Sequence, residues 1–121
     1  MTAKTSTRHL GIMNCAVAML AFVLPLVTLQ QASAAPPTPE RQSELVRMVR
    51  QDCGSCHGLR LAGGLGPALL PAALADQPVD ALVATVLNGR PGSAMPGWSR
   101  FMDENEAQWI VGELLKGFPE Q

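Results

Sequence analysis

The sequence predicts an all-α domain that follows an apolar leader. Apolar side chains recur three or four positions apart, as in Leu45, Val49 and Cys53, and this spacing places them on one face of a helix. The segments with this spacing are separated by stretches rich in glycine and proline, which end helices and form loops. No segment shows the alternation of apolar and polar residues that is typical of a half-buried strand.

Residues 1–34 are predicted to be a secretory signal peptide. Basic residues precede an almost wholly apolar stretch, 10–29, and Ala32-Ser33-Ala34 then offers a small-residue cleavage site. The apolar stretch approaches the ~20 residues that a bilayer span needs, so an uncleaved anchor is the alternative. Cleavage would leave residues 35–121 as one exported domain without stable membrane association.

The composition of the exported domain excludes some functions. Loss of Lys4 and Arg8 leaves seven basic and ten acidic residues, a net charge of −3, which makes nucleic acid an improbable partner and argues against a strongly basic docking face. A chain of 87 residues buries only a small core, and such domains often depend on a metal, a disulfide or a cofactor.

The first helix is expected from Glu40 to about Asp52, and it delivers the motif Cys53-Gly54-Ser55-Cys56-His57 at its end. Cys-x-x-Cys-His is the pattern of c-type haem attachment. Each thiol can add to one vinyl group of a porphyrin, and His57 can then bind the iron through Nε2. The motif therefore predicts one covalently held haem c with its iron.

Other uses of these cysteines fit the sequence less well. A redox Cys-x-x-Cys usually lies near a βαβ pattern, which is missing from this chain. A zinc site would need two more ligands, and no Cys or His follows His57. A simple disulfide would leave the histidine unexplained.

The middle of the chain reads as loop, short helix and longer helix. Four glycines make 58–67 a loop, and glycine lets backbone approach a flat ligand closely. A short helix is expected at Ala68–Ala75. A second clear helix starts at Asp76 or Gln77, with Pro78 near its first turn, and Asn88-Gly89 ends it.

Arg90 to Phe101 form a second loop rich in glycine and proline, and a last helix follows it. Asp103 and Glu106 have the spacing of a capping box at the start of that helix. Gly117 and Pro119 stop it. Its apolar face comprises Ala107, Ile110, Val111, Leu114 and Phe118, with Trp109 beside this face and expected to pack against the first helix.

This order of helices and loops resembles the small class I cytochromes c over nearly the whole exported chain. The resemblance implies that the first and last helices cross, and that the Pro67 carbonyl accepts a hydrogen bond from His57 Nδ1–H. Such a bond fixes the tautomer and raises the basicity of the ligand. Many members have glycine near the crossing, where this chain has Leu45, so a looser crossing is expected.

The resemblance also implies that Met95 is the second iron ligand. The exported domain contains no histidine besides His57, and its methionines are Met48, Met95 and Met102. Met102 is expected to fill the core, whereas Met95 lies in a Met-Pro loop after the middle helix, as the distal ligand of the family does. His/Met ligation raises the reduction potential. It leaves no open position, which favours electron transfer over reaction with a small substrate.

Three further side chains are candidates for the haem propionates. Arg90 and Trp98 flank Met95, and a guanidinium or an indole N–H can donate to a carboxylate. Arg60, in the loop after the motif, could donate to a propionate or could equally be a solvated charge.

Three loop strings resemble a narrower family, the c55x-type cytochromes: 53–60 (CGSCHGLR), 63–69 (GGLGPAL) and 88–98 (NGRPGSAMPGW). This resemblance implies a periplasmic single-electron carrier without enzymatic activity of its own. Its implied redox partner is the cytochrome cd1 nitrite reductase of denitrification, or alternatively an enzyme that matures haem d1. A ligand-binding sensor remains the third reading, and it would require Met95 to be absent from the iron.

Overall fold

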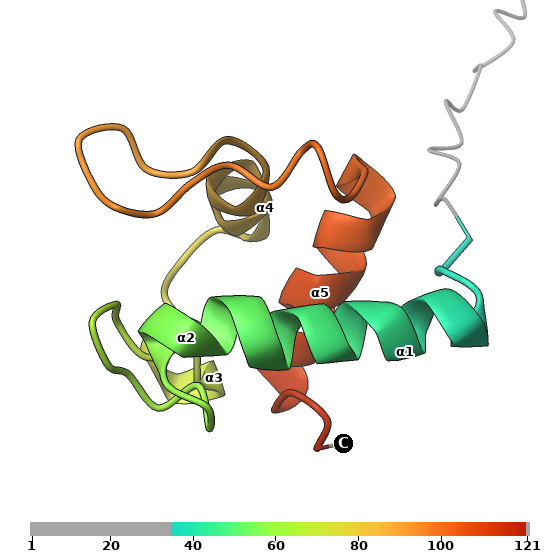
Figure 1. The fold of residues 1–121 in the computed structure, drawn as a ribbon, viewed down its shortest axis with the longest axis horizontal. Helices are drawn as coiled ribbons and strands as arrows, with labels where there is room; N and C mark the ends of the chain where they lie inside the picture. Colours follow the sequence, from blue (N-terminus) through green and yellow to red (C-terminus); the bar gives the residue numbers. More distant parts are fainter. Residues whose placement is uncertain (1–34, 121) are drawn as a thin grey trace, which may run out of the picture. The chain divides into compact units, whose positions relative to one another are not determined.

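The computed structural model describes residues 35–120, in which every regular element is a helix (Figure 1). The elements are α1 (Pro39–Met48), the π-helical turn η1 (Val49–Cys53), α2 (Gly54–His57), α3 (Pro71–Leu74), α4 (Val79–Asn88) and α5 (Glu104–Lys116). The predicted all-α class is confirmed. Within the described residues, no helix is both long and apolar enough to cross a bilayer.

The first helix is longer than the sequence predicts. Thr38 caps it, with its side chain accepting from Arg41 N–H, and Pro39 occupies the first turn, where its missing N–H costs nothing. Instead of ending near Asp52, the helix runs through η1 into α2, so the whole motif lies inside it. Gly54 N–H donates to the Val49 carbonyl five residues back, which is the π-helical pattern.

The middle helices are shorter than predicted. The expected helix at Ala68–Ala75 reduces to the single turn α3, because Leu70 stays extended and Pro71 supplies the first helical position. The next helix begins at Val79 and not at Asp76 or Gln77, with Pro78 as its N-cap. Its predicted end is correct: Gly89 follows with φ of +72°, a conformation that glycine adopts without strain.

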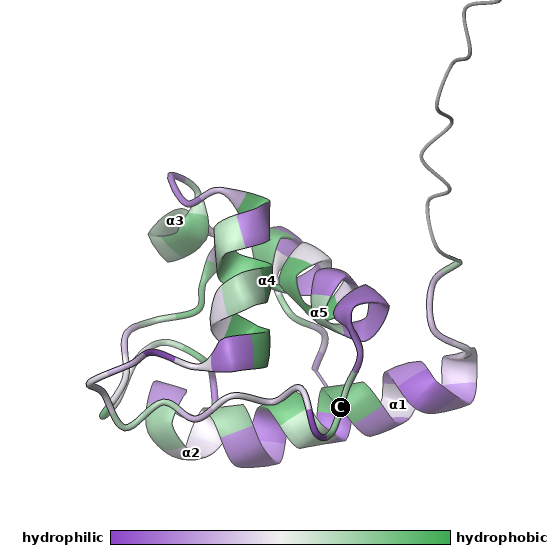
Figure 2. Cartoon of the chain, turned by 90° about the horizontal axis from the view of Figure 1, so that it is seen from above, coloured by the Kyte–Doolittle hydropathy of each residue, from purple (hydrophilic) through white to green (hydrophobic). Residues whose placement is uncertain are grey.

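The core lies where α3 and α4 pack on α5, and its buried cluster also contains Leu45 of α1 and Val49 of η1 (Figures 1 and 2). Met102 is buried in this core, as expected, and Trp109 packs against it only in part. Leu45 and Ala107 are completely buried, so the leucine at the expected crossing is accommodated inside the core. The buried apolar residues are Leu45, Val49, Leu61, Leu74, Val83, Met102, Ala107, Ile110, Val111 and Leu114.

A polar contact joins the starts of α1 and α5. Arg41 Nε donates to a Glu106 carboxylate oxygen at 2.6 Å, and Arg41 Nη2 donates to the Phe101 carbonyl at 2.8 Å. Glu106 also completes the predicted capping box, in which Asp103 and Glu106 each accept from the other's backbone N–H. The hydrogen bond from Arg41 lowers the pKa of Glu106, against the opposing effect of burial.

Replacing Glu106 with glutamine is expected to destabilise the fold by roughly 1–2 kcal/mol at neutral pH, through loss of the charged cap and the ion pair. Because the pKa of Glu106 is lowered, its stabilisation is present above the unfolded value of about 4.3 and is lost as pH falls through the lowered value. Urea unfolding should therefore show that the difference in the free energy of unfolding between Glu106→Gln and wild type is smaller at acid pH than at pH 7. Glu113→Gln is the control, since among residues 35–120 Glu113 pairs only with Lys116 on the same helix. An equal loss in both variants would contradict this account.

Candidate functional site

The two motif cysteines lie one turn apart on the continuous first helix. Cys53 ends η1 and is half-buried, whereas Cys56 in α2 is exposed, and neither thiol is in a disulfide. Residues three apart on a helix are surface neighbours, so both thiols can reach one ligand edge. The geometry supplies two free thiols on one face of the helix, Cys53 in an apolar setting and Cys56 in a solvated one.

The alternative uses of these cysteines find no support here. Burial raises the pKa of the Cys53 thiol to about 11, with a smaller contribution from Asp52, so this sulfur is protonated at neutral pH. A redox-active Cys-x-x-Cys needs the opposite, a thiol whose pKa is lowered. Within residues 35–120, no three His, Cys, Asp or Glu side chains are grouped as a metal site would require.

His57 is held in the tautomer that a metal ligand needs. Its side chain is buried, with 7% exposed, and its Nδ1 lies 2.7 Å from the Pro67 carbonyl oxygen, the contact that the resemblance implied. A carbonyl can only accept, so Nδ1 carries the hydrogen and Nε2 keeps its lone pair free. The imidazole is therefore preset to bind a metal through Nε2.

The glycine loop after the motif folds back onto the motif itself. A Cβ on Gly66 would lie 2.8 Å from His57 Cε1, so only glycine lets this backbone lie against the ring. Gly66 N–H donates to the Cys56 carbonyl and Gly63 N–H to the His57 carbonyl, each at 2.8 Å. The expectation that these glycines approach a flat ligand is thus incomplete, because here they seat the loop that carries Pro67.

The Met95 loop is fixed by its own backbone. Arg90 N–H donates to the Met95 carbonyl at 3.1 Å, and Met95 N–H reaches Ser93 Oγ at 3.3 Å. A Cβ on Gly89 would lie 2.5 Å from the Met95 carbonyl oxygen, which requires glycine there. The loop lies at the same end of the folded part as α2 (Figure 1). Met95 is half-buried.

The residues present fit a covalent haem by the chemistry of their donors. Two free thiols, a buried imidazole with a free Nε2 and a loop thioether are the set that attaches a porphyrin and binds its iron. Two hollows of the described surface, each of about 370 Å³, lie away from the motif residues. Both are lined by Arg50, Arg60 and Glu120, and by none of the motif residues.

The three candidate propionate donors lie in different surroundings. Arg90 is exposed on the Met95 loop, and Trp98 is half-buried with its ring 5.6 Å from that of Phe101. The backbone N–H of Trp98 donates to the Val86 carbonyl, and this bond ties the end of the loop to α4. Arg60 lines the hollows beside Glu120, away from the Met95 loop in sequence and in contacts.

Sequence reasoning missed two residues that support the motif. Arg50 donates to three backbone carbonyls, and Leu61 is buried with φ of +58°, a conformation that non-glycine residues rarely adopt. Neither carries a sequence signal, because the partners of Arg50 are main-chain atoms and a leucine gives no indication of its φ.

Comparison with known proteins gives consistent matches over this domain. Residues 40–112 match the family described as cytochrome C oxidase, cbb3-type, subunit III. The cytochrome c55X of Stutzerimonas stutzeri is 50% identical over 116 residues, 95% of this chain and 97% of that protein. The cytochrome c55X of Paracoccus denitrificans is 51% identical over 100 residues, 83% of this chain and 96% of that protein.

Two further matches extend this picture. The solved structure of the c-type cytochrome NirC is 53% identical, with a TM-score of 0.66 over 67% of this chain and 95% of NirC. The dihydro-heme d1 dehydrogenase of Pseudomonas aeruginosa is 33% identical over 84% of this chain, which corresponds to only 19% of that longer protein.

Proposed function

Because the chain belongs to the cytochrome c family and is similar to the cytochromes c55X, we propose that it is an exported carrier of single electrons with one covalent haem. The family implies a covalently bound haem and its iron. One haem is proposed because the chain contains one Cys-x-x-Cys-His motif. The proposed leader, residues 1–34, lies outside the described residues.

The observation that carries this proposal is the hydrogen bond of 2.7 Å between His57 Nδ1 and the Pro67 carbonyl. It leaves Nε2 as the free donor atom of a buried ring next to two free thiols. When bound, haem supplies a one-electron couple between ferric and ferrous iron. Cys53 and Cys56 would hold it covalently, and His57 would bind its iron.

Met95 is the proposed second ligand, and Arg90 and Trp98 are proposed donors to the propionates. The backbone contacts of the Met95 loop hold the thioether without using its sulfur. With His57 and Met95 both bound to the iron, no coordination position would be left for oxygen, peroxide or nitrite. The protein then passes electrons without substrate chemistry of its own.

The proposed partner is a cytochrome cd1 nitrite reductase, which receives electrons from this protein. This proposal rests on the likeness to c55X proteins over almost the whole chain. The second candidate is a redox step in haem d1 maturation. It is favoured by a specific observation, the 33% identity to part of a dihydro-heme d1 dehydrogenase.

An exposed apolar side chain marks the proposed docking face. Leu65 is 93% exposed, and its neighbours Gly64 and Gly66 lie against the Cys56 carbonyl, which places this part of the loop next to the backbone of Cys56. An apolar patch beside a redox group is suited to brief contact with a partner.

The charge around this face differs from the net charge of the chain. Residues 53–75 and 81–102 contain no carboxylate, and their charged residues are the exposed Arg60, Arg90 and Arg100. The ten acids of the domain all lie outside these two segments. Three arginines give these loops a modest positive charge, and the expectation that the docking face is not strongly basic stays a prediction.

Stopped-flow mixing of the reduced protein with a cytochrome cd1 nitrite reductase from the same organism tests the proposed function. We expect rapid oxidation when reductase and nitrite are both present, and none with nitrite alone. Leu65→Glu should lower the second-order rate by about tenfold, since it places a charge on an apolar contact. Val79→Glu, at an exposed apolar site at the start of α4, is the control. Failure to react with the reductase would favour the maturation role, and oxidation by nitrite alone would contradict the carrier function.

A further inference from the structure

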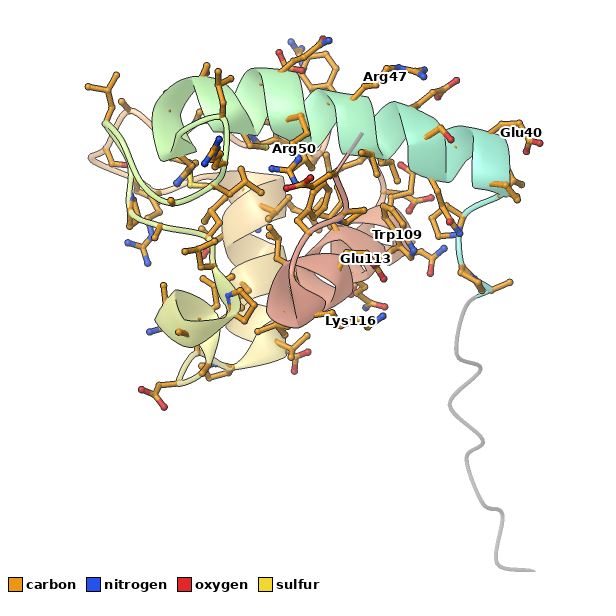
Figure 3. The ribbon with its side chains drawn as sticks, turned by 90° about the horizontal axis from the view of Figure 1, so that it is seen from below. Glu40, Arg47, Arg50, Trp109, Glu113 and Lys116 are labelled. Carbon is orange, nitrogen blue, oxygen red and sulfur yellow. The ribbon has the colours of Figure 1, made fainter. Side chains whose placement is uncertain are left out.

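Arg50 joins three segments that are far apart in sequence. Its Nη2 donates to the Phe118 carbonyl at 2.9 Å and to the Pro119 carbonyl at 2.8 Å, and its Nε donates to Pro119 at 3.2 Å. Its Nη1 donates to the Leu59 carbonyl at 3.2 Å, and its guanidinium lies 5.4 Å from the centre of the Phe118 ring. No other donor within residues 35–120 reaches these carbonyls. In Figure 3, Arg50 points from its helix toward α5, whereas Arg47 lies on the outer face.

The segment that Arg50 holds at Leu59 is the start of the loop that carries Pro67. Leu61 N–H donates to the Gly58 carbonyl at 2.7 Å, with Leu61 in its strained positive-φ conformation. Leu69 N–H then closes the loop on the Leu61 carbonyl at 2.8 Å. A loop with a strained residue needs contacts that fix it from outside, and the bond from Arg50 to Leu59 is one of them.

The segment that Arg50 holds on its other side is the C-terminal tail, residues 118–120. Gly117, with φ of +96°, turns the chain after α5, and Phe118 packs partly into the core. A planar guanidinium can donate in several directions at once, which lets one side chain bind the tail and the loop together.

We infer that Arg50 is a positioning residue that couples the C-terminal tail to the loop carrying Pro67, and so sets the hydrogen bond between Pro67 and His57. The importance of that bond for a redox iron rests on the proposed function. The coupling itself rests only on the contacts of Arg50. Loss of the tail and loss of the guanidinium should then have the same effect on the loop, because each removes one side of a shared support.

Three variants of the haem-loaded protein test the coupling: Arg50→Met, a chain that ends at Gly117, and the two changes combined. Amide hydrogen exchange is followed at Leu61, Gly63 and Gly66, whose N–H groups close the loop. Trp98 N–H, bonded to Val86 far from Arg50, reports global unfolding. Arg47→Met is the matched control, since Arg47 is exposed and makes no polar side-chain contact within residues 35–120.

We expect Arg50→Met and the shortened chain each to speed exchange at the three loop amides by about tenfold, and to leave Trp98 unchanged. The combined variant should be no faster than either alone, because coupled residues are not additive. Arg50→Lys, which keeps the charge but cannot reach all three carbonyls, should give a smaller increase. It also serves as the test if Arg50→Met does not fold. The reduction potential should rise in the same order, because a weaker bond from Pro67 makes His57 a less basic ligand.

Unchanged exchange at the three loop amides in Arg50→Met, or factors that multiply in the combined variant, would overturn the coupling. An unchanged potential despite a loosened loop would overturn the effect on His57. Intact mass separates this test from the test of the proposed function. A wild-type chain without covalent haem would contradict the proposed function, whereas the exchange rates of the loop amides would still test the coupling.

Discussion

Replacing both Cys53 and Cys56 with alanine is expected to give an exported chain that carries no covalent haem and does not keep its fold. The described core contains only ten buried apolar side chains. A domain of this size needs a further source of stability, and an attached haem would provide it. The measurement is intact mass of the exported protein, followed by circular dichroism during thermal unfolding.

Ser55→Ala is the matched control for this experiment. Ser55 lies between the two cysteines, and its hydroxyl donates to the Asp52 carbonyl within the same helix. This variant should leave the leader removed, one haem attached and the unfolding transition nearly unchanged. A doubly substituted chain that unfolds cooperatively without haem would contradict the account, because the protein core alone would then suffice.

Replacing Met95 with leucine should open the iron to carbon monoxide and lower the reduction potential. Leucine has nearly the same volume as methionine but lacks the thioether. The thioether favours ferrous iron, so its loss lowers the reduction potential. Axial ligands tune haem potentials over about 0.8 V, so a fall on the order of 0.2 V is expected. Carbon monoxide difference spectra and a redox titration measure the two effects.

Met102→Leu and Met48→Leu are the controls for Met95. Met102 is buried in the core beside Leu74 and Val83, where a thioether fills space. Met48 is half-buried at the end of α1. Both substitutions should cost little stability and leave the iron closed to carbon monoxide. If Met102→Leu opened the iron and Met95→Leu did not, the assignment of the second ligand would be wrong.

Local signals in the sequence predicted much of the fold. Asp103 and Glu106 form the capping box that their spacing indicates, and Gly89 ends α4 where Asn88-Gly89 predicted. The predicted end of the first helix, near Asp52, was wrong. Gly54 and Ser55 are poor helix formers, so no local signal favoured extending the helix through them. A π-helical turn over Val49–Cys53, which no local pattern in the sequence predicts, leads into α2, and Gly54 and Ser55 lie in that helix.

The site was less predictable than the fold. The contact between His57 and Pro67 came from the likeness to a family, and the structure contains it. That Gly66 must be glycine follows from the closeness of its backbone to the His57 ring, which is a tertiary distance. The role of Arg50 could not be read from the sequence at all, because its acceptors are main-chain carbonyls that lie 9 and about 70 residues away.

X-ray absorption at the iron edge of the oxidised, haem-loaded protein tests the central claim most directly. The claim is that both axial ligands are side chains of this chain, His57 and Met95. It predicts the nitrogen neighbours of the porphyrin and of His57, together with one sulfur, and it predicts that this sulfur is absent in Met95→Leu. An iron that lacks a sulfur neighbour in the wild-type protein, or keeps one in Met95→Leu, would contradict the claim.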